Sequence, residues 1–205
     1  WVYALYTIVD GLFVARGVSE VALTAVNLAF PFVSTLFALS LMFAVGTSTI
    51  VAIFFGRGQH DEGCQLFTQN MAVQLVISLP IIALLLPNLE AFAYFLGAPD
   101  ARTAELVVHY LRWIVPFTPL FLLSYSFEIM LKIDGFPKKA TAVVTVGVVG
   151  NCFLDWLMVF VLHKGIAGAA FATSLSQGLV TLFYLHHFLG KRGELSFQKF
   201  RFSFS

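Results

Sequence analysis

Charged residues are scarce in this sequence of 205 residues, at 11% of the chain. Soluble proteins carry about 25% charged residues, and somewhat under half of their side chains are apolar, whereas here hydrophobic residues reach 59%. So little polar surface cannot cover a compact globule of this size. The composition therefore excludes an ordinary soluble domain and favours an integral membrane protein.

Other missing features exclude further classes of protein. The net charge is only +1, and no basic run alternates with aromatic residues, so nothing supports nucleic-acid binding. The two cysteines, Cys64 and Cys152, have no spacing typical of a metal site or a disulfide framework. The histidines are scattered, and neither GxSxG nor HExxH occurs, so no nucleophile–base or zinc motif indicates an enzyme.

The few charged residues divide the chain into apolar segments. A helix needs about 20 residues to cross a hydrocarbon core of roughly 30 Å. The pattern predicts an all-α bundle of six transmembrane helices, near residues 1–16, 24–55, 63–86, 102–130, 139–162 and 166–189. The run from Val21 to Gly56 is too long for one perpendicular span, so part of it should be interfacial or tilted. Pro116 and Pro119 should bend the fourth helix.

Lysine and arginine predict the orientation of the bundle. If the amino end is cytoplasmic, the inner segments hold eight of the twelve basic residues, as the positive-inside rule requires. We expect residues 1–190 to form one six-helix lobe. Residues 191–205 should form a basic, partly disordered cytoplasmic linker within a longer protein.

Two acidic residues lie deep within predicted spans, Asp10 in the first and Asp155 in the fifth. Such residues are costly in a bilayer and are kept mainly where they pair, line water or act. Asn151 and Tyr6 each precede one of these acids by one helical turn and so share its face. The sixth span adds the polar patch Thr173, Ser174, Ser176 and Gln177.

No lysine or arginine lies at a depth where it could pair with Asp10 or Asp155. Two such carboxylates must share protons or hold a cation. Carboxylate, amide and hydroxyl oxygens suit a small hard cation, so Asp10, Asn151, Asp155 and Thr173 form a candidate proton or sodium site.

Simpler interpretations of these residues remain open. An intramembrane Asp can merely bond to a neighbouring helix, and small hydroxyl residues such as Thr173 commonly pack helix interfaces. Glu128 and Lys132 should form a surface pair, and His186 and His187 lie near an interface as weak candidate pH sensors.

Several segments together resemble one transporter family. They are Tyr6-Thr-Ile-Val-Asp10-Gly-Leu-Phe-Val-Ala-Arg16-Gly, Val21-Ala-Leu-Thr-Ala-Val26, Gly46, Gly56-Arg-Gly58, Asp134-Gly-Phe-Pro-Lys138, Asn151-Cys-Phe-Leu-Asp155 and Gly165-Ile-Ala-Gly-Ala-Ala-Phe-Ala-Thr173. In order and spacing they are similar to the amino-terminal half of the multidrug and toxic compound extrusion (MATE) transporters.

The resemblance implies one lobe of a twelve-helix transporter, whose second six-helix lobe would be its partner. It implies an antiporter of the inner (plasma) membrane that uses H⁺ or Na⁺ to export amphipathic organic compounds, with no cofactor besides that ion. It also implies that Asp10, Asn151, Asp155 and Thr173 form the cation site, with Tyr6 beside it.

Two alternatives remain. A lipid-linked oligosaccharide flippase of the same superfamily would need basic residues in its cavity, and this sequence has none at mid-membrane depth. A membrane scaffold without transport activity would have no reason to keep two acids in its spans.

Overall fold

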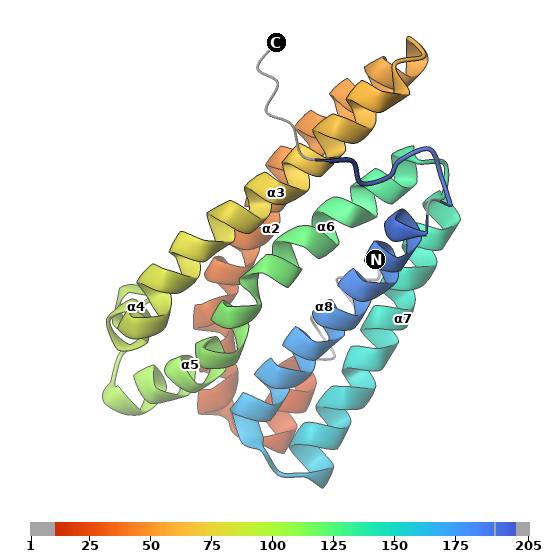
Figure 1. Cartoon of the computed structure of the whole chain (residues 1–205). Coiled ribbons are helices and arrows are strands. Elements are labelled where there is room, and N and C mark those ends of the chain that lie inside the picture. Colours follow the sequence, from red (N-terminus) through yellow and green to blue (C-terminus); the bar gives the residue numbers. More distant parts are fainter. Residues whose placement is uncertain (1–10, 191, 200–205) are drawn as a thin grey trace.

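The computed structural model describes residues 11–190 and 192–199, and all regular structure in these two ranges is helical (Figure 1). Residues 11–17 are helical. The elements that follow are α2 (Glu20–Gly56), α3 (His60–Leu85), η1 (Leu86–Asn88), α4 (Leu89–Phe95), α5 (Ala101–Ile114), η2 (Val115–Phe117), α6 (Thr118–Ile133), α7 (Pro137–Asp155), the π-helical η3 (Trp156–Val161) and α8 (Gly165–Leu189).

Five helical stretches of the described residues are long and apolar enough to cross a membrane. They are Glu20–Gly56, His60–Phe95, Ala101–Ile133, Pro137–Val161 and Gly165–Leu189. They match the second to sixth predicted spans, which confirms the prediction of a helical membrane bundle. Most of the first predicted span, near residues 1–16, lies outside the described residues.

The long apolar run of the second span forms one continuous helix. Ser19 begins it, because the Ser19 side chain accepts the Ala22 backbone N–H at 3.1 Å. The 37 residues of α2 extend about 55 Å, well beyond a hydrocarbon core. Accordingly, the end of α2 and the start of α3 project past the neighbouring helices in Figure 1.

Proline interrupts the fourth span where the sequence predicts a bend. Pro116 lies in the 3₁₀ turn η2, and Pro119 lies in the first turn of α6. Proline has no N–H to donate and clashes with the preceding turn, so the span divides into α5 and α6. The bundle therefore contains a broken helix: both halves pack against α2 and α8, while α5 also meets α4 and α6 also meets α3 and α7.

Buried polar side chains join the helices away from the predicted site. Ser40 of α2 donates to the Leu122 carbonyl oxygen at 2.6 Å and to Gln74 of α3 at 3.2 Å. Asn70, one turn from Gln74, donates to Ser126 of α6 at 3.0 Å. In a bilayer such bonds hold helices together with no hydrophobic contribution from lipid. The sequence does not single out these residues. In a segment without charges, a polar side chain that bonds to another helix looks the same as one that does not.

Residues 192–199, which follow α8, pack against the bundle. The sequence predicts a partly disordered linker, yet residues 192–199 lie against the ends of α3 and α6, and Leu195 is fully buried (Figure 1). Buried partners elsewhere in the chain hold this segment, and the composition of the segment alone cannot reveal them.

Candidate functional site

The fifth span presents two polar side chains on one buried face. Asn151 and Asp155 lie one turn apart near the end of α7, and their exposed fractions are 2% and 0%. Directly after Asp155 the helix changes to the π-helical turn η3. Single π-helical turns are rare and frequently lie at functional sites. This change of helix type thus begins next to the buried acid. Neither composition nor periodicity predicts it.

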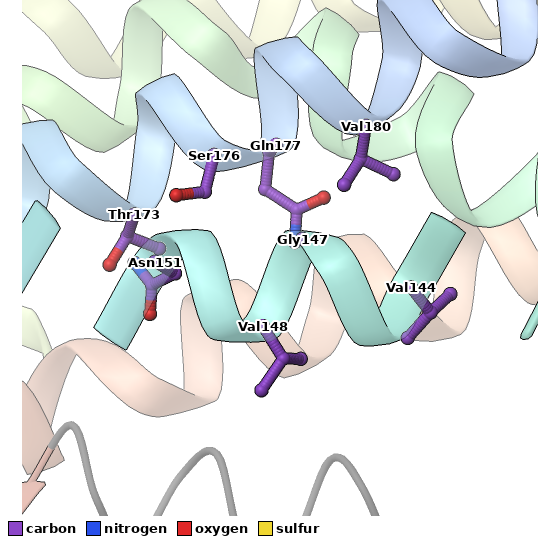
Figure 2. A pocket seen from close by; sticks show the side chains of 8 residues that line it. All are labelled: Val144, Gly147, Val148, Asn151, Thr173, Ser176, Gln177 and Val180. Atoms are coloured by element: carbon purple, nitrogen blue, oxygen red, sulfur yellow. The ribbon is translucent and has the colours of Figure 1, made fainter. Parts of the chain in front are cut away.

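Thr173 of α8 lies beside Asn151, as Figure 2 shows. The Asn151 amide satisfies both neighbours when its nitrogen donates to Oδ2 of Asp155 at 3.0 Å and its oxygen accepts from the Thr173 backbone N–H at 3.3 Å. Three of the four predicted cation-site residues therefore form one cluster. The fourth, Asp10, and its neighbour Tyr6 lie outside the described residues.

A small cavity opens between α7 and α8 next to this cluster. Its volume is about 30 Å³, which is enough for a water molecule. It is lined by Val144, Gly147, Val148, Asn151, Thr173, Ser176, Gln177 and Val180 (Figure 2). A Cβ added at Gly147 would lie 2.4 Å from Cγ2 of Val180, so glycine there allows the two helices to approach closely.

Two hydroxyl groups at this cavity stand out chemically. Oγ1 of Thr173 and Oγ of Ser176 are buried, and neither has a hydrogen-bond partner among the residues that the structure describes. A buried hydroxyl without a partner costs about 1–3 kcal/mol. By contrast, Gln177 accepts from Ser124 of α6 at 2.9 Å. The wall of the cavity thus has neutral hydroxyl oxygens that could bind a small ligand such as a water molecule or an ion.

The end of the first helix packs against the turn that follows Asp155. The Phe13 and Phe160 rings form an edge-to-face pair with centroids 5.7 Å apart. A Cβ at Gly17 would lie 2.2 Å from Cγ1 of Val159. Residues 11–17, which directly follow Asp10 in sequence, therefore contact η3 closely.

The other titratable residues singled out from the sequence lie away from this cluster. Glu128 and Lys132 form the predicted i,i+4 ion pair at 2.6 Å. The sequence predicts that His187 lies near the membrane interface. Within the protein its side chain is fully buried, and its Nε2 lies 3.0 Å from Oδ2 of Asp134. Among the described residues, no group of three or more His, Cys, Asp and Glu side chains could hold a metal ion.

Comparison with known families identifies the relatives of this chain. A family model described as MatE matches residues 1–157, which is more than half of the chain. The chain belongs to this family, the MATE multidrug efflux transporters.

Curated MATE relatives are bacterial export proteins. The chain is 26% identical over 193 residues to the multidrug export protein MepA of Staphylococcus haemolyticus, covering 94% of this chain and 42% of that protein. It is 23% identical over 185 residues to MepA of Staphylococcus aureus, covering 90% of this chain and 41% of that protein. The chain thus spans about two-fifths of the length of these relatives.

Solved MATE structures share the fold. One, crystallised in complex with a molecule designated MaD3S, has a TM-score of 0.90 and 26% identity, and the match covers all of this chain and 46% of that one. Another, an outward-facing multidrug resistance MATE transporter, has a TM-score of 0.88 and 25% identity over 96% of this chain and 44% of that one. The described lobe therefore corresponds to less than half of each solved chain.

Proposed function

We propose that this chain is the amino-terminal lobe of a cation-coupled antiporter that exports amphipathic organic compounds. The coupling ion, H⁺ or Na⁺, binds at Asp155, Asn151 and Thr173 together with Asp10 of the first helix. A second six-helix lobe of the same polypeptide completes the transporter, and its action is transport rather than catalysis.

The observation that carries this proposal is the buried cluster at the contact of α7 and α8. The Asn151 amide bridges the Asp155 carboxylate and the Thr173 backbone at 3.0 and 3.3 Å. A carboxylate in such a place favours a proton or a metal cation as its countercharge.

Coupling requires that the ion and the exported compound prefer different states of the lobe. Ion binding neutralises the carboxylate, and this changes the polar network between α7, α8 and the first helix. The contact of residues 11–17 with η3 gives a direct mechanical connection from the Asp155 turn to the first helix. Differential affinity of this kind is what links the two binding events.

The proposed location is the inner (plasma) membrane, with the amino end in the cytoplasm. Eight of the twelve lysines and arginines then face the cytoplasm, in agreement with the positive-inside rule. The ends of α2, α6 and α8 and the starts of α3 and α7 would then lie on the cytoplasmic side.

The test replaces each acid by its neutral isostere in the full-length protein. Asp10→Asn and Asp155→Asn should each abolish cellular resistance to an amphipathic cation such as ethidium, while membrane insertion remains normal. The matched control is Glu105→Gln, because Glu105 is an exposed residue of α5. This variant should retain resistance. Efflux from vesicles under a sodium gradient or a pH gradient then identifies the ion. Wild-type efflux from either Asp variant would refute the assignment.

A further inference from the structure

The segment after α8 forms a strap, here defined as residues 192–199. It crosses the end of α6 and reaches α3, as the dark blue trace in Figure 1 shows. Its contacts involve α3, the α6–α7 connection and α8, which are far apart in sequence. None of these contacts belongs to the cation site.

Asp134, at the end of α6, is the main polar anchor of the strap. Its Oδ1 accepts the Leu195 backbone N–H at 2.7 Å, and its Oδ2 accepts from Nε2 of His187 at 3.0 Å. The Asp134 and His187 side chains are both fully buried. Nζ of Lys139 lies 2.7 Å from Nδ1 of His187. With Lys139 as an ammonium group, which can only donate, Nδ1 of His187 accepts and its Nε2–H donates to the carboxylate.

At this anchor the Asp134 carboxylate binds the backbone of the strap directly. A buried carboxylate is stable only when donors surround it, and here a ring N–H and a backbone N–H supply them. A Cβ added at Gly193 would lie 1.8 Å from Oδ2 of Asp134. The strap can therefore approach Asp134 only because residue 193 has no side chain.

The strap is also held on its α3 side. Leu195 is fully buried in the apolar cluster that includes Phe67, and the Phe197 ring lies 5.0 Å from the Phe67 ring. Cys64 Sγ donates to the Glu194 carbonyl oxygen at 3.2 Å. The Gln198 backbone N–H donates to Oγ1 of Thr68 at 3.1 Å.

We propose that Asp134 is a positioning residue that, with Gly193, fastens the strap to the first lobe as a permanent part of it. The first lobe then extends to Gln198 and does not end with α8. During transport the strap stays docked while the lobes change their relative position. This last statement rests on the proposed two-lobe transport function; the docking itself does not.

Hydrogen exchange measured by mass spectrometry on the full-length protein tests the docking. The strap amides that donate to Asp134 and Thr68 should be protected in the wild type. Gly193→Ala should make their exchange at least about tenfold faster, with the helices unchanged. Gly56→Ala is the matched control, because a Cβ there meets nothing within 4 Å, and it should leave strap exchange as in the wild type. Rapid exchange in the wild type, or no change in Gly193→Ala, would overturn the proposal.

A disulfide tests whether the strap stays docked during transport. Glu194→Cys is introduced after every cysteine except Cys64, Cys152 included, has been replaced. It puts a second thiol on the residue whose backbone carbonyl oxygen lies 3.2 Å from Sγ of Cys64. Mild oxidation should cross-link them, and the cross-linked protein should retain efflux. Loss of efflux that a reductant restores would show that the strap must undock. Failure to cross-link would contradict the docking. The exchange experiment needs no transport, so failure of the docking and failure of the transport function are distinguishable.

Discussion

Thr173→Val separates a cation ligand from a hydroxyl that only packs between helices. Valine keeps the shape of threonine and removes Oγ1, which is buried without a hydrogen-bond partner among the described residues. If Oγ1 is a ligand, the substitution should have two opposite effects. The ion-free protein should become more stable, because an unsatisfied hydroxyl is removed, and the ion should bind more weakly.

The expected magnitudes follow from the burial of this hydroxyl. Removing it should stabilise the ion-free protein by about 1 kcal/mol, and this raises Tm of the full-length protein by about 1–2 °C, because the shift per kcal/mol falls as the chain gets longer. Losing one neutral oxygen ligand should cost about 1.4 kcal/mol, which is a tenfold weaker Kd. At an ion concentration of about 100 Kd for the wild type, stabilisation by the ion should fall from about 2.7 to about 1.4 kcal/mol.

The assay is thermal unfolding of the purified full-length protein over a sodium series. A pH series replaces it if sodium does not stabilise the wild type. Thr181→Val is the control on the same helix, because Thr181 Oγ1 donates to the carbonyl oxygens of Leu120 at 3.1 Å and Gln177 at 2.8 Å. This control should lower Tm and leave the ion dependence unchanged. An unchanged ion-dependent gain in Thr173→Val would refute the ligand role of Oγ1.

Three further predictions concern the packing around the site and the ends of the helices. Gly147→Ala should lower stability by about 1–3 kcal/mol, because the new Cβ meets Val180 at 2.4 Å; thermal unfolding measures this. Gln74→Leu removes the buried bond from Ser40 of α2 and the bond to Asn70 within α3, and it should cost about 0.6–1.7 kcal/mol in a detergent unfolding titration. The Thr103 backbone N–H lowers the pKa of the Asp100 carboxyl below its ordinary value of 3.8, so this cap stabilises α5 above that pH and is lost as the pH falls through the lowered value. The protection of amides at the start of α5, taken relative to their intrinsic exchange rates at each pH, should therefore fall in acid in the wild type but not in Asp100→Asn.

The first two of these predictions have control variants in other helices of the bundle. Gly46→Ala adds a Cβ in open space and should leave Tm nearly unchanged, in contrast to Gly147→Ala. Thr145→Val removes an exposed hydroxyl that bonds only within its own helix, and it should cost less than Gln74→Leu. Equal effects within either pair would contradict the role assigned to close packing or to the interhelical bond.

The spans, the bend in the fourth helix and the alignment of Asn151 with Asp155 could be predicted from the sequence. Charge-free length sets where a helix can cross a membrane, proline removes a backbone donor, and residues four apart share a helical face. These are local properties of the chain, so no tertiary information is needed to recognise them.

The contacts between distant segments depended on the tertiary structure. Periodicity could single out Thr173 as polar, but only the close approach of α7 and α8 at Gly147 places it beside Asn151. The π-helical turn after Asp155 likewise has no signal in composition or spacing.

The strap shows most clearly which features follow from the sequence and which depend on the tertiary structure. Its composition predicts a partly disordered linker, and Asp134 and His187 look like ordinary polar residues near an interface. Only folding brings the Asp134 carboxylate, the His187 ring and the Leu195 N–H together in one buried place. The sequence alone determined which segments enter the bilayer, because transfer from water depends on each segment by itself. The tertiary structure decided which polar groups meet there, because a buried hydrogen bond needs two partners whose positions are set by the packing of whole helices.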